Sequence, residues 1–236
     1  MTSVAETGKG TRKKSASKMA VDADTKTRLI HAATALFSTK GIDGVSTRDI
    51  TSAAKANSAA IGYHFGSKDN LVREVFSALA APMNRTRLDA LTQYEASVPA
   101  DAQLDIEQVA RCLIEPALRS ASDPGHDAHA LSRLLLLART LPGPWVTNVL
   151  AEQYDEVFNR FISAFSRALP ELDRETICWR YDFLVGSLLY ASSYYYGQSR
   201  IARITEGKCD PADVDNVIDQ LVHFAGGAMR CGAIGR

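Results

Sequence analysis

The sequence predicts an all-α fold of about nine helices, with a three-helix N-terminal part and a larger C-terminal helical bundle. From Asp24 onward, large apolar side chains recur every three or four positions, which is the period of an amphipathic helix. No segment gives a convincing strand pattern of alternating apolar and polar residues, and no internal repeat is evident. Proline and glycine interrupt the helical runs at intervals, which predicts where one helix ends and the next begins.

The first elements are defined by their ends. Residues 1–23 are mainly small, polar and basic, so we expect a disordered basic tail. A helix follows over 24–40, and Gly41 is placed to end it. Ser46 and Asp49 form a capping box that starts a helix of about seven residues. After a turn near 55–57, a second short helix is expected from Ser58 to about His64.

The rest of the chain predicts longer helices. Ser67 precedes a long run in which Leu71, Val75 and Leu79 share one face. The segment 174–198 is apolar on nearly every side, so we expect a buried helix there. The Pro-Gly-Pro at 142–144 is expected to break the chain, and Asp210-Pro211 to start the last helix. The other predicted helices lie near 106–118, interrupted by Pro116, and over 131–139 and 146–169.

Charge is distributed unevenly along the chain. The 236 residues have a formal net charge of zero and are 46% hydrophobic, which suits one large or two smaller domains. Residues 1–73 carry 12 Lys and Arg against 6 Asp and Glu, whereas residues 74–236 carry 15 against 21. This asymmetry predicts one segment that meets phosphate and another that does not.

Cysteine spacing and hydropathy indicate a cytoplasmic protein without a membrane partner. Four widely spaced cysteines contain no CxxC pair, so we expect reduced thiols and not a disulfide framework or a zinc site. The N-terminus has no apolar stretch like that of a signal peptide. The longest uncharged stretch, 183–199, contains serines and four tyrosines, which favours a buried helix over a membrane span.

The two short helices over 46–64 suit DNA. The second helix is built from very small side chains, so its backbone can approach a major groove, where alanine methyls can touch thymine methyls. Thr47, Tyr63 and Lys68 flank it with hydroxyls and a cation suited to phosphate oxygens. A generic pair of packed helices, without a DNA role, is the alternative that the pattern alone leaves open.

This region resembles the DNA-binding module of the TetR family of regulators. The opening Thr47-Arg48 and Ile50, and the closing His64-Phe65 and Lys68, fall in register with the family pattern, as do Ala54 and Leu71. The preceding AATALFSTKGIDGVST is similar to the first helix of the family, so the resemblance covers about 24–76.

The resemblance implies a helix-turn-helix domain over 24–73 that binds double-stranded operator DNA. It also implies a ligand-binding and dimerisation domain over 74–236, whose last two helices pair in a homodimer. The residues expected at DNA, from the pattern and the resemblance together, are Thr47, Arg48, Asn57, Ser58, Ala59, Tyr63, His64 and Lys68.

Two positions depart from the family pattern. The usual turn glycine is Lys55, and if that position requires a left-handed backbone, the lysine costs on the order of 1 kcal/mol. The usual tyrosine two residues before His64 is Gly62, and Tyr63 is our substitute for its contact with phosphate.

The C-terminal part is expected to hold a pocket for a small apolar effector. Parts of it (LSRLLLLART, YDEVFNRFISAFSRALPEL and the pair Trp179-Arg180) are similar to TetR-type repressors that respond to long-chain fatty acids. This similarity implies a fatty acid, an acyl derivative or another elongated apolar ligand. If the ligand has a carboxylate, Arg139 is our candidate to face it. For any one of these side chains, plain core packing is the alternative. The expected pocket residues are Leu135, Arg139, Trp145, Tyr154, Phe158, Trp179, Phe183 and Tyr190.

Other function classes fit the sequence less well. His126 and His129 are spaced for a metal but lack a third ligand, so we expect no metal and no cofactor. An enzyme on a helical bundle would need a nucleophile motif, a phosphate loop or paired carboxylates, and the sequence has none of these. A ligand-free architectural DNA-binding protein remains an alternative, which ligand-dependent release from DNA would distinguish.

Overall fold

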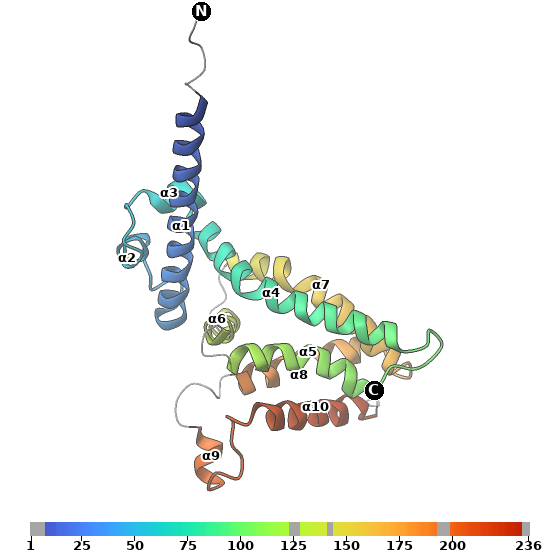
Figure 1. The fold of residues 1–236 in the computed structure, drawn as a ribbon. Coiled ribbons are helices and arrows are strands. Elements are labelled where there is room, and N and C mark those ends of the chain that lie inside the picture. The colour runs from blue at the N-terminus through green and yellow to red at the C-terminus, as the bar shows by residue number, and fades with distance from the viewer. Residues whose placement is uncertain (1–7, 123–127, 141–143, 193–198, 233–236) are drawn as a thin grey trace, which may run out of the picture. The chain divides into compact units, whose positions relative to one another are not determined.

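The computed structural model describes residues 8–122, 128–140, 144–192 and 199–232, except for the side chains of 8–21, 128, 139–140 and 144–146. These ranges contain ten helices and no strand, which confirms the all-α prediction (Figure 1). In chain order the helices are α1 (Gly8–Lys40), α2 (Thr47–Ala53), α3 (Ala60–Phe65), α4 (Lys68–Ser97), α5 (Ile106–Ser122), α6 (Ala128–Thr140), α7 (Pro144–Ala168), α8 (Arg174–Ser192), α9 (Arg200–Ile204) and α10 (Val214–Arg230).

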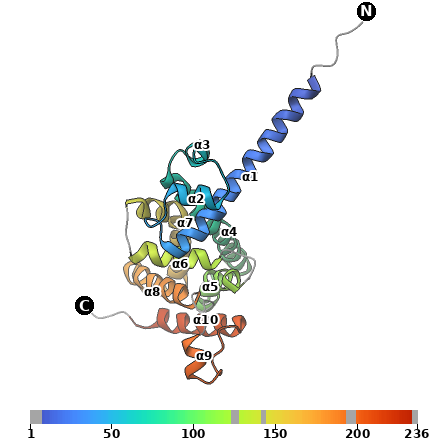
Figure 2. The same cartoon turned by 90° about the vertical axis from the view of Figure 1, so that its left-hand side faces the viewer.

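The chain divides into two compact units, Met1–Val75 and Phe76–Arg236. In the first unit, α2 and α3 lie beside α1 (Figure 2). Apolar side chains from α1, α2, α3 and the first residues of α4 are buried together, because a short helix has too little apolar surface to be stable alone. The largest of these core residues are Leu29, Phe37, Ile50, Ile61, Phe65, Leu71 and Val72.

The predicted end of α1 and the predicted start of α2 are confirmed. Gly41 has φ 74° and donates its N–H to the carbonyl of Phe37 at 3.0 Å, so it ends α1 in the left-handed conformation that glycine tolerates. The Ser46 hydroxyl accepts from the N–H of Asp49 at 3.1 Å, and the Asp49 carboxylate accepts from the N–H of Ser46 at 2.9 Å. This capping box satisfies two backbone donors and lowers the pKa of Asp49.

The start of α1 differs from the disorder predicted for 1–23, since the helix begins at Gly8. Lysine, arginine, alanine and methionine dominate residues 9–20, and all of them are good helix formers. Extending an existing helix also avoids the cost of a new nucleus, so composition alone underestimated helix formation here.

In the second unit, α5, α7, α8 and α10 surround one apolar core that includes Leu113, Phe161, Phe165 and Val222 (Figure 1). The helices α5 and α10 lie side by side and are joined by exposed ion pairs: Arg111–Asp219 at 2.6 Å, Arg119–Asp215 at 2.9 Å and Arg230–Glu107 at 2.9 Å. Exposed pairs of this kind contribute little free energy, so the buried apolar face of α10 is the main source of this packing.

Several elements of the second unit differ from the prediction. Helix α5 continues past Pro116 to Ser122 without the predicted interruption, and α6 begins at Ala128. Helix α7 begins at Pro144 and not after it, because proline suits the first position of a helix, where no N–H is needed. Helix α10 begins at Val214 under an Asp213 cap, while Asp210 instead accepts from Ala212 N–H in the preceding turn. The five-residue α9 was not predicted, since it is too short to show a periodic stripe.

Helix α8 is not buried all round, although its composition predicted that. Trp179, Phe183 and Tyr190 are 58%, 64% and 63% exposed. Residues 193–198 of the predicted helix lie outside the described residues. Over the described ranges, no helix combines the length and apolar character that crossing a membrane requires. All four cysteines are free thiols.

Candidate functional site

The turn between α2 and α3 is built on Lys55. The N–H of Ala56 donates to the carbonyl of Thr51 at 2.9 Å, and the N–H of Lys55 donates to that of Ser52 at 3.1 Å. This pair of bonds is a Schellman motif, which needs a left-handed residue directly after the helix cap. Lys55 is this left-handed residue, with φ 50°. The backbone strain that we expected if this position required a left-handed conformation is therefore present.

Helix α3, in the recognition-helix position, begins two residues later than expected. The Asn57 side-chain oxygen accepts from the N–H of Ala59 at 2.9 Å, and its main-chain carbonyl accepts from Ala60 at 2.9 Å. Asn57 therefore shapes the entry to α3. Gly66, with φ 75°, ends the helix.

The residues predicted to meet DNA differ in exposure. Tyr63 is 70% exposed, and its ring meets that of His64 edge-on with centroids 4.9 Å apart. His64 and Lys68 are half-buried, so each has contacts inside the unit. The other five predicted residues are exposed: Thr47, Arg48, Asn57, Ser58 and Ala59.

Lys68 has a structural contact that the sequence did not predict. Its ammonium donates to the carbonyl of Ile42 at 2.6 Å and lies 6.0 Å from the centre of the Phe37 ring. An ammonium has three N–H groups, so this bond still leaves donors for a phosphate oxygen. Lys68 thus ties the start of α4 to the loop after α1, whatever it does at DNA.

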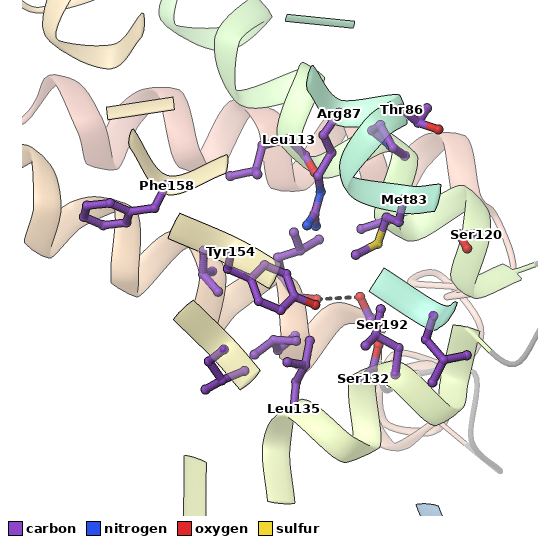
Figure 3. Close-up of a pocket in the computed structure, with 18 of the residues that line it drawn as sticks. Met83, Thr86, Arg87, Leu113, Ser120, Ser132, Leu135, Tyr154, Phe158 and Ser192 are labelled. Carbon is purple, nitrogen blue, oxygen red and sulfur yellow. Dashed lines mark hydrogen bonds between the residues drawn. The ribbon is translucent and has the colours of Figure 1, made fainter. Parts of the chain in front are cut away.

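The second unit contains a cavity of about 860 Å³. Its walls come from α4, α5, α6, α7 and α8, and most of the lining side chains are apolar (Figure 3). Two of the lining residues, Pro82 and Pro116, lie inside helices α4 and α5. A volume of this size is within the range of about 300–1,000 Å³ that small-molecule sites occupy.

A buried arginine projects into this cavity. Arg87 of α4 is 6% exposed; its Nε donates to the carbonyl of Leu113 at 2.9 Å and its Nη1 to Asn84 Oδ1 at 3.3 Å. Asn84, also 6% exposed, donates to the carbonyl of Gln153 at 2.7 Å and so links α4 to α7. Burial lowers the pKa of Arg87, but a guanidinium stays protonated at neutral pH.

Tyr154 of α7 shares the cavity with Arg87 (Figure 3). Its hydroxyl oxygen is buried and has no hydrogen-bond partner in the described part of the chain. Burial raises the pKa of Tyr154 to about 12, against the opposing effect of the Arg87 charge. The phenol is therefore neutral at physiological pH and can donate one hydrogen bond.

Three of the predicted pocket residues line this cavity: Leu135, Tyr154 and Phe158. Trp179 and Phe183 do not; they line a separate groove of about 850 Å³ between α8 and α10. Tyr190 is exposed and belongs to neither set of lining residues. The side chains of Arg139 and Trp145 lie outside the described residues.

The face that α8 and α10 present to solvent is rich in aromatic side chains. Trp179 and Phe183 stack with ring centroids 6.0 Å apart, and Phe224 of α10 is 59% exposed on the other side of the groove. Gly227, next to this groove on α10, has no neighbour within 4 Å of where a Cβ would stand. Large exposed apolar patches mark interaction sites.

Sequence reasoning missed Arg87 and Asn84. Arg87 lies in the polar run NRTRLD, which suggested solvent exposure. Its position gave a signal nonetheless, since Leu79, Met83, Arg87 and Leu91 are spaced four apart and share one helix face. A charged residue on an apolar stripe is the feature that would have identified it.

No metal site occurs among the described residues, where no group of three or more His, Cys, Asp or Glu side chains is placed to hold an ion. His126 lies outside the described residues, and burial and the Arg133 charge lower the pKa of His129.

Comparison with known proteins agrees with both units. Residues 29–75 match the family model described as bacterial regulatory proteins of the tetR family, and residues 111–228 match that of the tetracyclin repressor-like C-terminal domain. No curated protein matches the chain.

Two solved structures are similar in fold. The TetR family transcriptional regulator PfmR from Thermus thermophilus is 15% identical with a TM-score of 0.58, covering 88% of this chain and 97% of that one. A bacterial regulatory protein in the tetR family from Rhodococcus is 15% identical with a TM-score of 0.59, covering 89% and 98%.

Proposed function

The chain belongs to the TetR family of bacterial regulatory proteins, and on this premise we propose that it is a ligand-responsive repressor that a small apolar molecule releases from operator DNA. The observation that carries the proposal is helix α4. It begins at Lys68, three residues after the recognition helix, and its residues from Ala78 to Arg87 line the cavity. One continuous element therefore takes part in both the DNA-binding unit and the ligand-binding unit.

We propose that α3 enters the major groove and that Asn57, Ser58 and Ala59 contact bases, while Thr47, Arg48 and Tyr63 contact phosphates. His64 and Lys68 support these contacts from half-buried positions. The recognition segment has no Arg or Gln for a bidentate base contact, so shape readout carries a substantial share of specificity.

Variants of the phosphate contacts test this placement. Replacing Arg48 with alanine should weaken binding to all DNA sequences alike and reduce the salt slope by about 1 per subunit, measured by fluorescence anisotropy at several salt concentrations. Arg203→Ala, an exposed arginine on α9, is the control and should leave the slope unchanged. An unchanged slope with Arg48→Ala would refute its contact with phosphate.

The proposed homodimer uses the exposed face of α8 and α10. Its stacked Trp179 and Phe183 lie beside a groove large enough to receive aromatic side chains, so two copies of the face can pair with each other. Pairing also supplies two recognition helices, which a short α3 needs because one copy reads only a few base pairs.

Light scattering tests the dimer. The wild type should have twice the 25.6 kDa mass of the chain, and the double variant Phe183→Glu, Phe224→Glu should have that mass once. Ile204→Glu is the matched control, because Ile204 is 56% exposed but lies on α9, outside this face. A wild-type monomer, or a dimeric double variant, would contradict the proposed interface.

The proposed response follows from two arrangements of α4. A ligand that prefers the arrangement unsuited to the half-site spacing of the operator lowers DNA affinity, typically by about 5- to 150-fold. Reciprocity requires operator DNA to weaken ligand binding by the same factor. Fatty acids and acyl derivatives are the first candidates, because parts of α6 and α7 resemble the fatty-acid-responsive members of the family.

Filling the cavity tests this response. Leu135 lines the cavity, whereas the adjacent Leu136 is 38% exposed. Leu135→Phe should give a repressor that binds operator but is no longer released by the inducing acid, in a mobility-shift titration. Leu136→Phe should respond like the wild type. Normal release with Leu135→Phe would mean that the effector does not occupy this cavity.

A further inference from the structure

Arg87 is a buried charge without a counter-ion. Among the described residues, no carboxylate forms an ion pair with its guanidinium. Asp155 and Asp182 line the same cavity, but both are exposed, and neither is among the groups that shift the pKa of Arg87. A buried cation is costly unless it is paired, so an anion in this cavity would remove a standing penalty.

The Arg87 guanidinium is fixed in position, and some of its N–H groups remain without a hydrogen-bond acceptor. Bonds to Leu113 and Asn84 use two of its five N–H groups, and Asn84 is itself fixed by its bond to α7. The remaining three N–H groups have no partner in the described part of the chain. A fixed planar fork of N–H donors matches the two oxygens of a carboxylate.

Among the residues that line the cavity in the described part of the chain, one buried side-chain donor has no partner. The hydroxyls of Thr86 and Ser192 donate to the carbonyls of Pro82 and Leu188, at 3.1 and 2.8 Å. The Tyr154 hydroxyl, in contrast, is buried and unpartnered, and it faces the same space as Arg87 (Figure 3). The cavity therefore brings together a buried cation and a buried, unpartnered neutral donor, with walls that are otherwise mainly apolar.

We propose that Arg87 and Tyr154 form the head-group subsite of the effector and that the effector is a monocarboxylic acid with an apolar body. The guanidinium binds the carboxylate, the Tyr154 hydroxyl donates to it, and the apolar body lies against the side chains around Leu135 and Phe158. One buried cation neutralises one negative charge, so a carboxylate fits better than a phosphate monoester, which carries up to two. This inference names the ligand class for the proposed function and rests on it.

Direct binding to the full-length protein without DNA tests the subsite. The probes are straight-chain acids from octanoate to tetradecanoate, each with its primary amide, its alcohol and its alkyl phosphate, measured by calorimetry. The wild type should bind at least one acid and prefer it over the matched uncharged analogues and the phosphate. Equal affinity for acid and amide, tighter binding of the phosphate, or no binding of any acid would overturn the proposal.

Variants locate the head group. Arg87→Met should weaken acid binding by at least about 30-fold and leave amide binding nearly unchanged, because a buried charge pair is worth about 2 kcal/mol or more. Tyr154→Phe should weaken acid binding by about 10- to 100-fold. It removes only an unpartnered hydroxyl and so should fold normally, which keeps the site testable even if Arg87→Met does not fold. Arg85→Met, an exposed arginine on the same helix, should change nothing. If either Tyr154→Phe or a folded Arg87→Met binds the acid as tightly as the wild type, the proposed site is refuted.

Operator release separates this inference from the proposed function. If acids bind through Arg87 but leave operator binding unchanged, the subsite stands and the proposed induction fails. If a neutral molecule releases the operator from wild type and Arg87→Met alike, the induction stands and the subsite fails.

Discussion

Replacing Lys55 with glycine should stabilise the N-terminal unit. Lys55 holds φ 50° in the turn between α2 and α3, and a left-handed backbone costs an L residue about 1–2 kcal/mol. Glycine removes this cost but has more freedom in the unfolded chain, which offsets about 0.4–1 kcal/mol of the gain. The net effect expected is a stabilisation of about 1 kcal/mol.

Amide hydrogen exchange on the full chain measures this effect where it arises. Buried segments of α1 and α2 should exchange about fivefold more slowly in Lys55→Gly, since 1 kcal/mol corresponds to about that factor. Lys55→Ala keeps the Cβ and should show no slowing. Ala56→Gly, one residue further and outside the left-handed region, should exchange faster.

Two outcomes would refute this reasoning. Unchanged exchange in Lys55→Gly would mean that the turn stores no strain, and equal slowing in Lys55→Ala would assign the effect to the lost charge. DNA binding gives an independent check, because both variants remove the same charge. Their salt slopes should therefore agree, and any difference in affinity between them reports the geometry of the turn.

Three further predictions concern stability. Gly44→Ala should destabilise the first unit by about 1–3 kcal/mol, seen as faster amide exchange, because a Cβ would lie 2.6 Å from the carbonyl oxygen of Lys40. Ser46→Ala should lower the stability of the first unit by about 1 kcal/mol, again measured by amide exchange. Unchanged exchange would mean that the Ser46 cap does not stabilise α2. The pKa of Tyr154 is about 12 in the folded chain and about 10 in the unfolded chain, so its contribution to the free energy of unfolding is complete below about pH 10 and is lost as the pH rises to about 12. In urea unfolding, Tyr154→Phe should therefore reduce the decline of stability between about pH 10 and 12.

The first unit could be predicted closely because its signals are local. The Gly41 stop and the Ser46 capping box each depend on residues within one helical turn, so the sequence contains all that determines them. The strain at Lys55 was also foreseeable, since this lysine stands where the family pattern of the resemblance has its turn glycine. The entry to α3 was less accurate, because Asn57 uses its side chain for a turn.

The second unit was harder because its site depends on distant segments. The composition of α8 cannot distinguish a helix buried in its own chain from one with an exposed aromatic face, and Trp179 and Phe183 lie on such a face. Burial of Arg87 requires α5 and α7 to approach α4, and no local pattern encodes that approach. Only Leu135, Tyr154 and Phe158 of the predicted set line the cavity.

The two prolines in the cavity wall bear on how motion travels along α4. Pro82 has no N–H, so the carbonyl of Ala78 lacks its usual helical donor, and Pro116 does the same to Cys112 in α5. A helix bends most easily where one of its backbone hydrogen bonds is missing. Both prolines line the cavity, so a molecule bound there, as we propose, would contact each helix at the point where its backbone hydrogen bonding is interrupted.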